Sequence, residues 1–286
     1  MTEAPAPAPG NTRTAAPGAQ DLADDLAVAL AAAEAGMAEA RRLYHHAEVQ
    51  HKDDGSEVTA ADLAAETAIR KVLQEARPQD TLVGEEFGGT LGDGRQWIVD
   101  PIDGTTCFAL GLPTFGTLVG LAIDGEPVVG VIGAPVTGEL TYAHQGGGCH
   151  WRANLSAAPQ PVRVRPVESL EDAWVAAAGP NGANKRHKDA LTHRFDAILK
   201  KAGRFRYIGD CTQHALLCRG KVDLVLDTEM SPWDIAALVT PLRESGASVV
   251  GVDGGAGPIL TAGGIVAASS PALLEQAMSL LPPRQA

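Results

Sequence analysis

The sequence predicts a layered α/β protein built from its 286 residues. Its second half alternates short apolar strands with amphipathic helices, an order typical of sheets covered by helices. Its first half opens with apolar residues at steps of three and four over 21–46, which predicts a long helix. Two apolar runs that meet at Asp124-Gly125 predict a β-hairpin. Helices and strands are therefore mixed along the whole chain.

The first half is predicted to hold a second helix followed by strands. Thr59 and Asp62 form a capping-box pattern, which marks the start of a helix that runs to about Glu75. Apolar runs predict strands at 81–83, 97–99, 115–124, 127–133 and 140–144. A glycine-rich patch at 146–148 then leads into a predicted polar linker near 152–160.

The second half is predicted to contain five strands and four helices. The strands are expected at 173–178, 205–208, 222–226, 247–252 and 264–268, and the helices at 186–201, 211–219, 232–245 and 271–281. The length suits one large unit or two tightly joined halves, which we place at 21–155 and 156–286. The Pro/Ala-rich tail at 1–20 is expected to be disordered.

Charge and cysteine content narrow the class of protein. The formal net charge is −12 and no basic stripe is present, so nucleic acid and anionic membranes are not expected as partners. The four cysteines form no C-x-x-C pair, which favours reduced thiols and a cytoplasmic location. No stretch reaches the roughly 20 apolar residues of a membrane span, and the N-terminus lacks the features of a signal peptide.

Three acidic segments carry the chemistry that the sequence suggests. They are GEEFG at 84–88, DPIDGT at 100–105 and SPWD at 231–234. Each lies where a predicted strand ends or a predicted helix begins, which is where α/β folds place their ligand sites. The sequence therefore predicts one shared site built from distant segments.

The DPIDGT segment offers hard oxygen ligands. Pro101 restricts the turn, so both neighbouring aspartates, Asp100 and Asp103, and the carbonyl of Ile102 can face one side, as Mg²⁺ requires. The amides around Gly104 and Thr105 are suited to hold an anion. A phosphate monoester needs such a site, because metals offset its repulsion of an attacking hydroxide. Crowded carboxylates in turn need cations, since like charges raise one another's pKa.

Each acidic residue also has an explanation that involves no ligand. Glu85 and Glu86 alone suit a solvated patch, and Asp100 or Asp103 alone suits the cap of a turn, since Asp-Gly is an ordinary turn dipeptide. Asp234 suits the first turn of a helix that Ser231 caps, as Asp62 does behind Thr59. The joint occurrence of these patterns is what favours a metal site.

The combined pattern resembles the inositol monophosphatase superfamily over residues 22–280. The matching segments are SEVTAAD at 56–62, GEEFG at 84–88, WIVDPIDGTTCF at 97–108 and PWDIAALVTPLRESG at 232–246. The resemblance implies an α-β-α-β-α sandwich, a homodimer, and hydrolysis of a small phosphate monoester with two or three Mg²⁺ ions.

The resemblance also implies a role for each matching residue. The implied metal ligands are Glu85, Asp100, the carbonyl of Ile102, Asp103 and Asp234. Glu86 is implied to orient the attacking water, and Thr105 with Asp62 to take its proton. The amides of Gly104 and Thr105 are implied to hold the phosphate.

Within the superfamily the chain is most similar to the histidinol-phosphate phosphatase branch, through the run at 115–135 and the segment Gly209-Asp210-Cys211. Asp210 and Asp227 are then expected to face a substrate ammonium, although Asp210 equally suits a helix N-cap. Cys107 and the stretch 212–214 depart from the branch, so inositol, nucleotide and sugar phosphates stay open as substrates. A catalytically silent, metal-binding relative is the alternative of another class.

Overall fold

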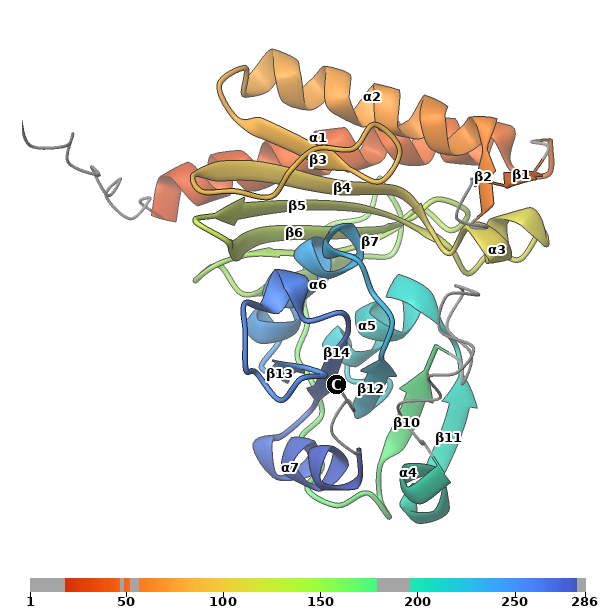
Figure 1. The fold of residues 1–286 in the computed structure, drawn as a ribbon, viewed down its shortest axis with the longest axis vertical. Coiled ribbons are helices and arrows are strands. Elements are labelled where there is room, and N and C mark those ends of the chain that lie inside the picture. Colours follow the sequence, from red (N-terminus) through yellow and green to blue (C-terminus); the bar gives the residue numbers. More distant parts are fainter. Residues whose placement is uncertain (1–18, 47–48, 52–56, 179–195, 282–286) are drawn as a thin grey trace, which may run out of the picture.

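The computed structural model describes residues 19–46, 49–51, 57–178 and 196–281. These residues form five layers of helix, sheet, helix, sheet and helix, as Figure 1 shows. The predicted α-β-α-β-α sandwich is thus confirmed. Residues 1–18, most of the tail at 1–20, lie outside the described residues.

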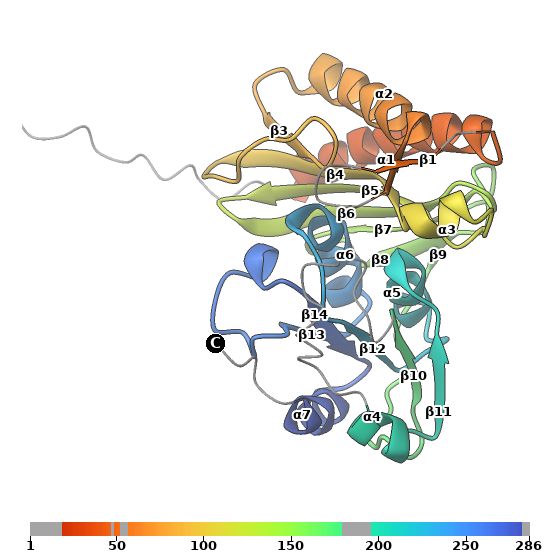
Figure 2. The same cartoon turned by 45° about the vertical axis from the view of Figure 1, so that its right-hand side comes forward.

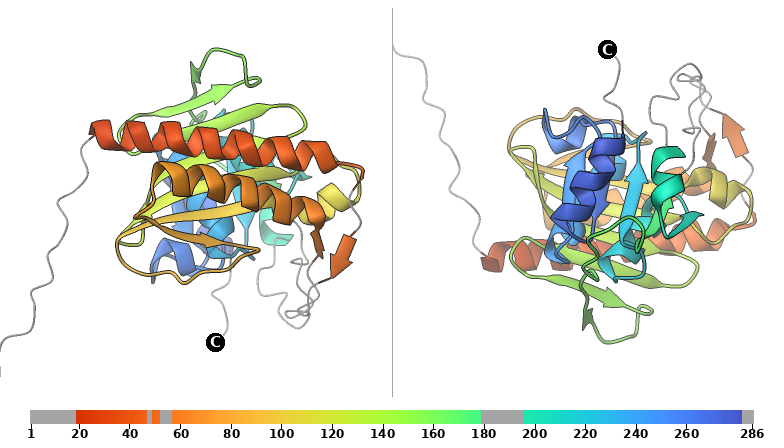
Figure 3. Two further views of the ribbon diagram at one scale, coloured as in Figure 1. Left: turned by 90° about the horizontal axis from the view of Figure 1, so that it is seen from above. Right: turned by 90° about the horizontal axis from the view of Figure 1, so that it is seen from below.

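The first layer contains two long helices, α1 (Ala19–Leu43) and α2 (Ala60–Ala76). They lie side by side across one face of the larger sheet (Figure 3). Thr59 caps α2, and the predicted capping box with Asp62 is present. Figure 2 shows the short hairpin of β1 (Val49–His51) and β2 (Glu57–Thr59) at the end of the sheet where α3 lies.

The larger sheet has seven strands in the order β3-β4-β5-β6-β7-β8-β9. Only β3 and β4 run parallel, and the other neighbours are antiparallel. The strands are β3 (Thr81–Gly84), β4 (Arg95–Asp103), β5 (Gly116–Ile123), β6 (Glu126–Ala134), β7 (Glu139–His144), β8 (Cys149–Arg152) and β9 (Gln160–Pro161). Positive φ angles at Asp124 and Gly125, 50° and 81°, confirm the predicted hairpin turn. The sequence did not predict β8 and β9, which lie on either side of the expected linker.

The smaller sheet has five strands in the order β11-β10-β12-β14-β13. They are β10 (Trp174–Ala177), β11 (Arg204–Tyr207), β12 (Leu224–Asp227), β13 (Ser248–Gly251) and β14 (Ile265–Ala268). β14 runs antiparallel to both of its neighbours, whereas β10 is parallel to β11 and β12. All five strands were predicted to within two residues at each end.

The remaining helices fill the middle layer and the outer face of the smaller sheet. α5 (Asp210–Cys218) and α6 (Pro232–Glu244) lie between the sheets, and α3 (Thr105–Ala109) lies at their edge. α4 (Asp196–Lys201) and α7 (Pro271–Leu280) form the last layer, and a short 3-10 turn, η2, spans Ile259–Thr261. Of the helix predicted at 186–201, only the last six residues lie within the described part. No helix of the described residues is long and apolar enough to cross a membrane.

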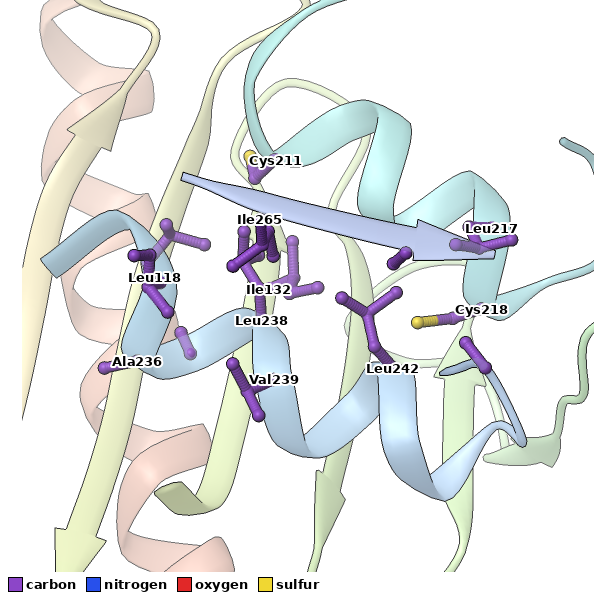
Figure 4. Packing of buried hydrophobic residues seen from close by; sticks show 14 of the residues in the cluster. Leu118, Ile132, Cys211, Leu217, Cys218, Ala236, Leu238, Val239, Leu242 and Ile265 are labelled. Carbon is purple, nitrogen blue, oxygen red and sulfur yellow. The ribbon is translucent and has the colours of Figure 1, made fainter. Parts of the chain in front are cut away.

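α6 is the centre of the core. Its residues 235–242 are all buried, and Figure 4 shows Leu238 packed among side chains of both sheets, including Ile132 and Ile265. The helix lies close to the larger sheet because glycines face it. A Cβ at Gly130 would lie 2.2 Å from the carbonyl oxygen of Ala237. This close packing fixes where the N-terminus of α6 meets the sheet.

Candidate metal centre

A bulge in β4 brings two aspartates to one face of the sheet. Asp100 follows Ile98 at the strand period of two, so it points toward α6 as Ile98 does. Asp103, three residues on, would point away in a regular strand. The pairing with β5 shifts between these two aspartates by one extra residue on β4, which reverses the alternation. Pro101 lies inside this bulge, and its carbonyl accepts a hydrogen bond from the hydroxyl of Thr117 at 2.9 Å.

The bulge and the start of α6 place three carboxylates together. One oxygen each of Asp100, Asp103 and Asp234 lie within 4.8 Å of one another, and we call these residues the acidic cluster. Asp234 is the third residue of α6, where its carboxylate accepts a hydrogen bond from the amide of Ser231 at 2.7 Å. The convergence expected from two distant segments is therefore observed.

Burial and mutual repulsion raise the pKa values of the carboxyl groups in the acidic cluster. Burial, and then the charges of Glu85, Asp103 and Asp234, raise the pKa of Asp100 well above its usual range. Burial raises the pKa of Asp234 to about 7. Burial, followed by the charges of Asp210 and Asp234, also raises the pKa of Asp103. Such groups ionise together only when cations lie among them, so the all-oxygen donor set fits hard divalent ions.

Glu85 lies next to the acidic cluster, directly after the neighbouring strand β3. β3 runs parallel to β4 with Gly84 opposite Val99, and the amide of Glu85 donates to the carbonyl of Val99 at 3.3 Å. Glu85 therefore lies beside Asp100, and the charge of Glu85 helps to raise the pKa of Asp100. Glu86 follows in the same loop and is partly exposed.

Asp62 and Thr105 form the pair that the sequence suggested. One oxygen of Asp62 accepts hydrogen bonds from the backbone amide and the hydroxyl of Thr59, at 2.8 and 2.7 Å. The other lies 3.5 Å from the hydroxyl of Thr105, which also donates to the carbonyl of Ile102 at 3.1 Å. The capping role of Asp62 thus leaves its second oxygen for Thr105.

Gly104 has a positive φ angle of 89° immediately before α3. A Cβ there would lie 2.7 Å from the carboxylate of Asp210, so the position favours glycine on both counts. The amide of Cys211, at the start of α5, donates to Asp103 at 2.5 Å. The first turn of α5 therefore orients one side of the acidic cluster.

Asp210 is the first residue of α5 and not its N-cap, which is Gly209. The N-cap alternative is wrong because Gly209 is the N-cap, and the Asp210 carboxylate accepts a hydrogen bond from the thiol of Cys107, 3.6 Å away. Burial, and then the charge of Asp227, raise the pKa of Asp210 to about 6. The two aspartates expected to face an ammonium group are thus neighbours.

Two residues of the stretch 212–214, which departs from the histidinol-phosphate phosphatase branch, lie next to Asp227. The side-chain amide of Gln213 lies 3.4 Å from its carboxylate, and Nε2 of His214 lies 3.8 Å away. Both side chains are fully buried. Neither ring nitrogen of His214 has a hydrogen-bond partner among the described residues.

The cysteines beside the site are not suited to nucleophilic chemistry. Burial raises the pKa of Cys211 well above that of an ordinary thiol, and burial also raises the pKa of Cys107. Both thiols therefore stay protonated near neutral pH, as expected of packing residues.

Residues 21–285 match the sequence profile described as Inositol monophosphatase family. The chain belongs to this family. Membership makes it a phosphatase that acts on small phosphate monoesters, and the acidic cluster lies where the matching motifs meet. Members of the inositol monophosphatase family use divalent metal ions.

Comparison with individual family members adds detail. The chain is 37% identical over 238 residues to a histidinol-phosphatase of Mycobacterium tuberculosis, covering 82% of this chain and 90% of that protein. It is 34% identical over 244 residues to a histidinol-phosphatase of Streptomyces coelicolor, covering 83% and 90%. The crystal structure of the extragenic suppressor protein suhB from Bartonella henselae superimposes with a TM-score of 0.79 at 26% identity, covering 90% of this chain and 98% of that one.

Proposed function

We propose that this phosphatase is Mg²⁺-dependent and hydrolyses histidinol phosphate or a similar phosphate that carries an amine. The observation that carries the metal dependence is the acidic cluster, whose three oxygens lie within 4.8 Å of one another. The preference for an amine is supported by Asp210 and Asp227 next to that cluster, and by the similarity to proteins named histidinol-phosphatase.

The proposed magnesium ligands are the acidic cluster, Glu85 and the carbonyl of Ile102. Two or three Mg²⁺ ions bound there would offset the charge of the phosphate and lower the pKa of the attacking water. The oxygen donors match the hard-ligand preference of Mg²⁺. The carbonyl of Ile102 accepts a hydrogen bond from the hydroxyl of Thr105 at 3.1 Å, and a carbonyl oxygen has two lone pairs.

The other residues in the proposal bind and orient. The Thr105 hydroxyl accepts the proton of the attacking water as it passes its own proton to the carboxylate of Asp62, 3.5 Å away. Glu86 orients that water, and the amides of Gly104 and Thr105 hold the phosphate oxygens. Positive charge on the substrate then lies against Asp210 and Asp227, so the substrate is bound at both ends.

A phosphate-release assay tests this function. Protein stripped with EDTA should be inactive and should recover on addition of Mg²⁺. We expect histidinol phosphate to exceed inositol 1-phosphate, AMP, fructose 1,6-bisphosphate and 3′-phosphoadenosine 5′-phosphate in kcat/KM. Acetylating the substrate amine, or the change Asp227→Asn, should remove most of that preference. Equal kcat/KM for all five compounds would reject amine recognition, and activity that survives EDTA would reject the metal mechanism.

Assembly and location complete the proposal. By family likeness we propose a homodimer in the cytoplasm. Light scattering on the purified protein should give twice the mass of one chain, and a monomer at micromolar concentration would contradict the dimer.

A further inference from the structure

A buried carboxylate lies directly behind the loop that carries Glu85 and Glu86. Glu66 is on α2, one turn after Asp62, and its side chain is fully buried. It accepts hydrogen bonds from the backbone amides of Glu86 and Phe87, at 2.8 and 3.3 Å. A charged acceptor held by two loop amides fixes the backbone more firmly than a neutral one would.

The loop is shaped to fit around this carboxylate. Gly84 faces it so closely that a Cβ would lie 2.1 Å from Oε1 of Glu66. The amide of Gly84 also donates to the carbonyl of Gly88 at 3.1 Å, which closes the segment 84–88 on itself. Glycine at position 84 is therefore required by the carboxylate behind it.

Arg70 completes the arrangement from the next turn of α2. Its Nε donates to Glu66 at 2.7 Å, and Nη2 donates to the carbonyl of Gly88 at 3.1 Å. Its guanidinium lies 5.4 Å from the ring centre of Phe87. Arg70 thus offsets the charge of Glu66 and contacts the far end of the same loop.

One face of α2 therefore supports two parts of the site. Asp62 contacts Thr105, and Glu66 one turn later fixes the backbone on the C-terminal side of Glu85. The other side of that loop is tied to β4 through the amide of Glu85. Glu85 is held between these two attachments, which leaves its side chain beside Asp100.

We propose that Glu66, with Arg70 as its counterion, is a positioning residue that holds the 84–88 loop so that Glu85 faces the acidic cluster. This inference rests on the proposed metal-dependent function. Residues that orient metal ligands typically change metal affinity by about 10- to 100-fold when they are mutated. Loss of Glu66 should therefore weaken metal binding, beyond any effect on folding.

The test compares Glu66→Ala and Glu66→Gln with the wild type by calorimetric titration of Mg²⁺ and by phosphate release. We expect Glu66→Ala to raise the Kd for Mg²⁺ by about 10- to 100-fold, with a matching rise in the Mg²⁺ concentration for half-maximal rate. kcat at saturating Mg²⁺ should recover most of its wild-type value. Glu66→Gln keeps one acceptor oxygen, so its Kd for Mg²⁺ should lie between those of the wild type and Glu66→Ala.

Asp223→Ala is the matched control. Asp223 is also fully buried, pairs with Arg165 at 2.5 Å and accepts a hydrogen bond from the amide of Trp174 at 2.8 Å. It lies immediately before β12, away from the 84–88 loop. Its removal should lower Tm and leave the Kd for Mg²⁺ unchanged.

Wild-type affinity for Mg²⁺ in both folded Glu66 variants would overturn the positioning role and leave the proposed function intact. If Glu66→Ala does not fold, Glu66→Gln alone decides. A wild-type protein that binds no Mg²⁺ would instead overturn the proposed function, and this inference with it.

Discussion

Asp62 and Asp234 each complete the capping box of a helix and also belong to the candidate site. The Asp62 carboxylate is shared between Thr59 and Thr105, and Asp234 both accepts the amide of Ser231 and belongs to the acidic cluster. From the sequence, capping and site membership are competing explanations. A carboxylate has two oxygens, so both hold at once.

Asparagine in place of one cluster aspartate tests its proposed charge. Asp100→Asn or Asp234→Asn should lower kcat/KM with Mg²⁺ by about 1,000-fold, equivalent to about 4 kcal/mol of transition-state stabilisation. Tm of the metal-free protein should not fall, because the change relieves repulsion among buried carboxylates.

Asp93→Asn is the control, since it removes the same charge from an exposed loop. It should leave kcat/KM unchanged. Near-normal, Mg²⁺-dependent turnover in Asp100→Asn or Asp234→Asn would show that the proposed ligand roles are wrong.

Helices and strands were largely predictable because their apolar periodicity is local. The capping box at Thr59 and the hairpin at Asp124-Gly125 need only neighbouring residues, and both are confirmed. The bulge in β4 was not predictable, because it depends on the register with β5. Glu66 was missed for the same reason, since its partners are loop amides about 20 residues away.

The close approach of α6 to the larger sheet offers a test. Gly130→Val would put side-chain atoms where the α6 backbone lies, so we expect a loss of about 1–3 kcal/mol or more in the free energy of unfolding. Because Asp234 is on α6, kcat with Mg²⁺ should fall as well. Chemical denaturation and phosphate release measure the two effects.

Gly92→Ala is the control for this change. A Cβ there would meet only the side-chain amide of Gln96, at 4.0 Å. Both the stability and kcat should stay at wild-type values. A Gly130→Val protein as stable and as active as Gly92→Ala would contradict the packing described for α6.

In the whole molecule, the candidate site draws on both sheets and the helices around them. β4 of the larger sheet supplies Asp100 and Asp103, and Glu85 follows the end of β3. α6 supplies Asp234, and β12 of the smaller sheet ends at Asp227. Motif residues along the chain predicted that these segments meet. The layer order was expected only through the resemblance to the inositol monophosphatase superfamily, because that order follows from tertiary packing that no single segment specifies.

The raised acidities predict an unusual pH dependence of stability. The ordinary pKa of an Asp is 3.8, and folding raises it to about 7 in Asp234 and to about 6 in Asp210. Between these values the metal-free folded state binds more protons than the unfolded state, so these groups make stability fall as pH rises from about 4 to 7. Bound Mg²⁺ favours the ionised form and should reverse the loss.

Thermal unfolding with EDTA or with saturating Mg²⁺ measures this effect. The gain in Tm from Mg²⁺ should be larger at pH 8 than at pH 5.5, and Asp234→Asn should reduce the difference. A gain in Tm that is the same at both pH values would contradict the proposed link between cluster ionisation and metal binding.

The most direct test is a crystal structure with Mn²⁺ in place of Mg²⁺, measured at the manganese absorption edge. We predict anomalous peaks within coordination distance of carboxylate oxygens from Asp100, Asp103 and Asp234, with Glu85 beside one of them. A well-occupied Mn²⁺ bound elsewhere, or an acidic cluster without a peak at saturating Mn²⁺, would contradict the account.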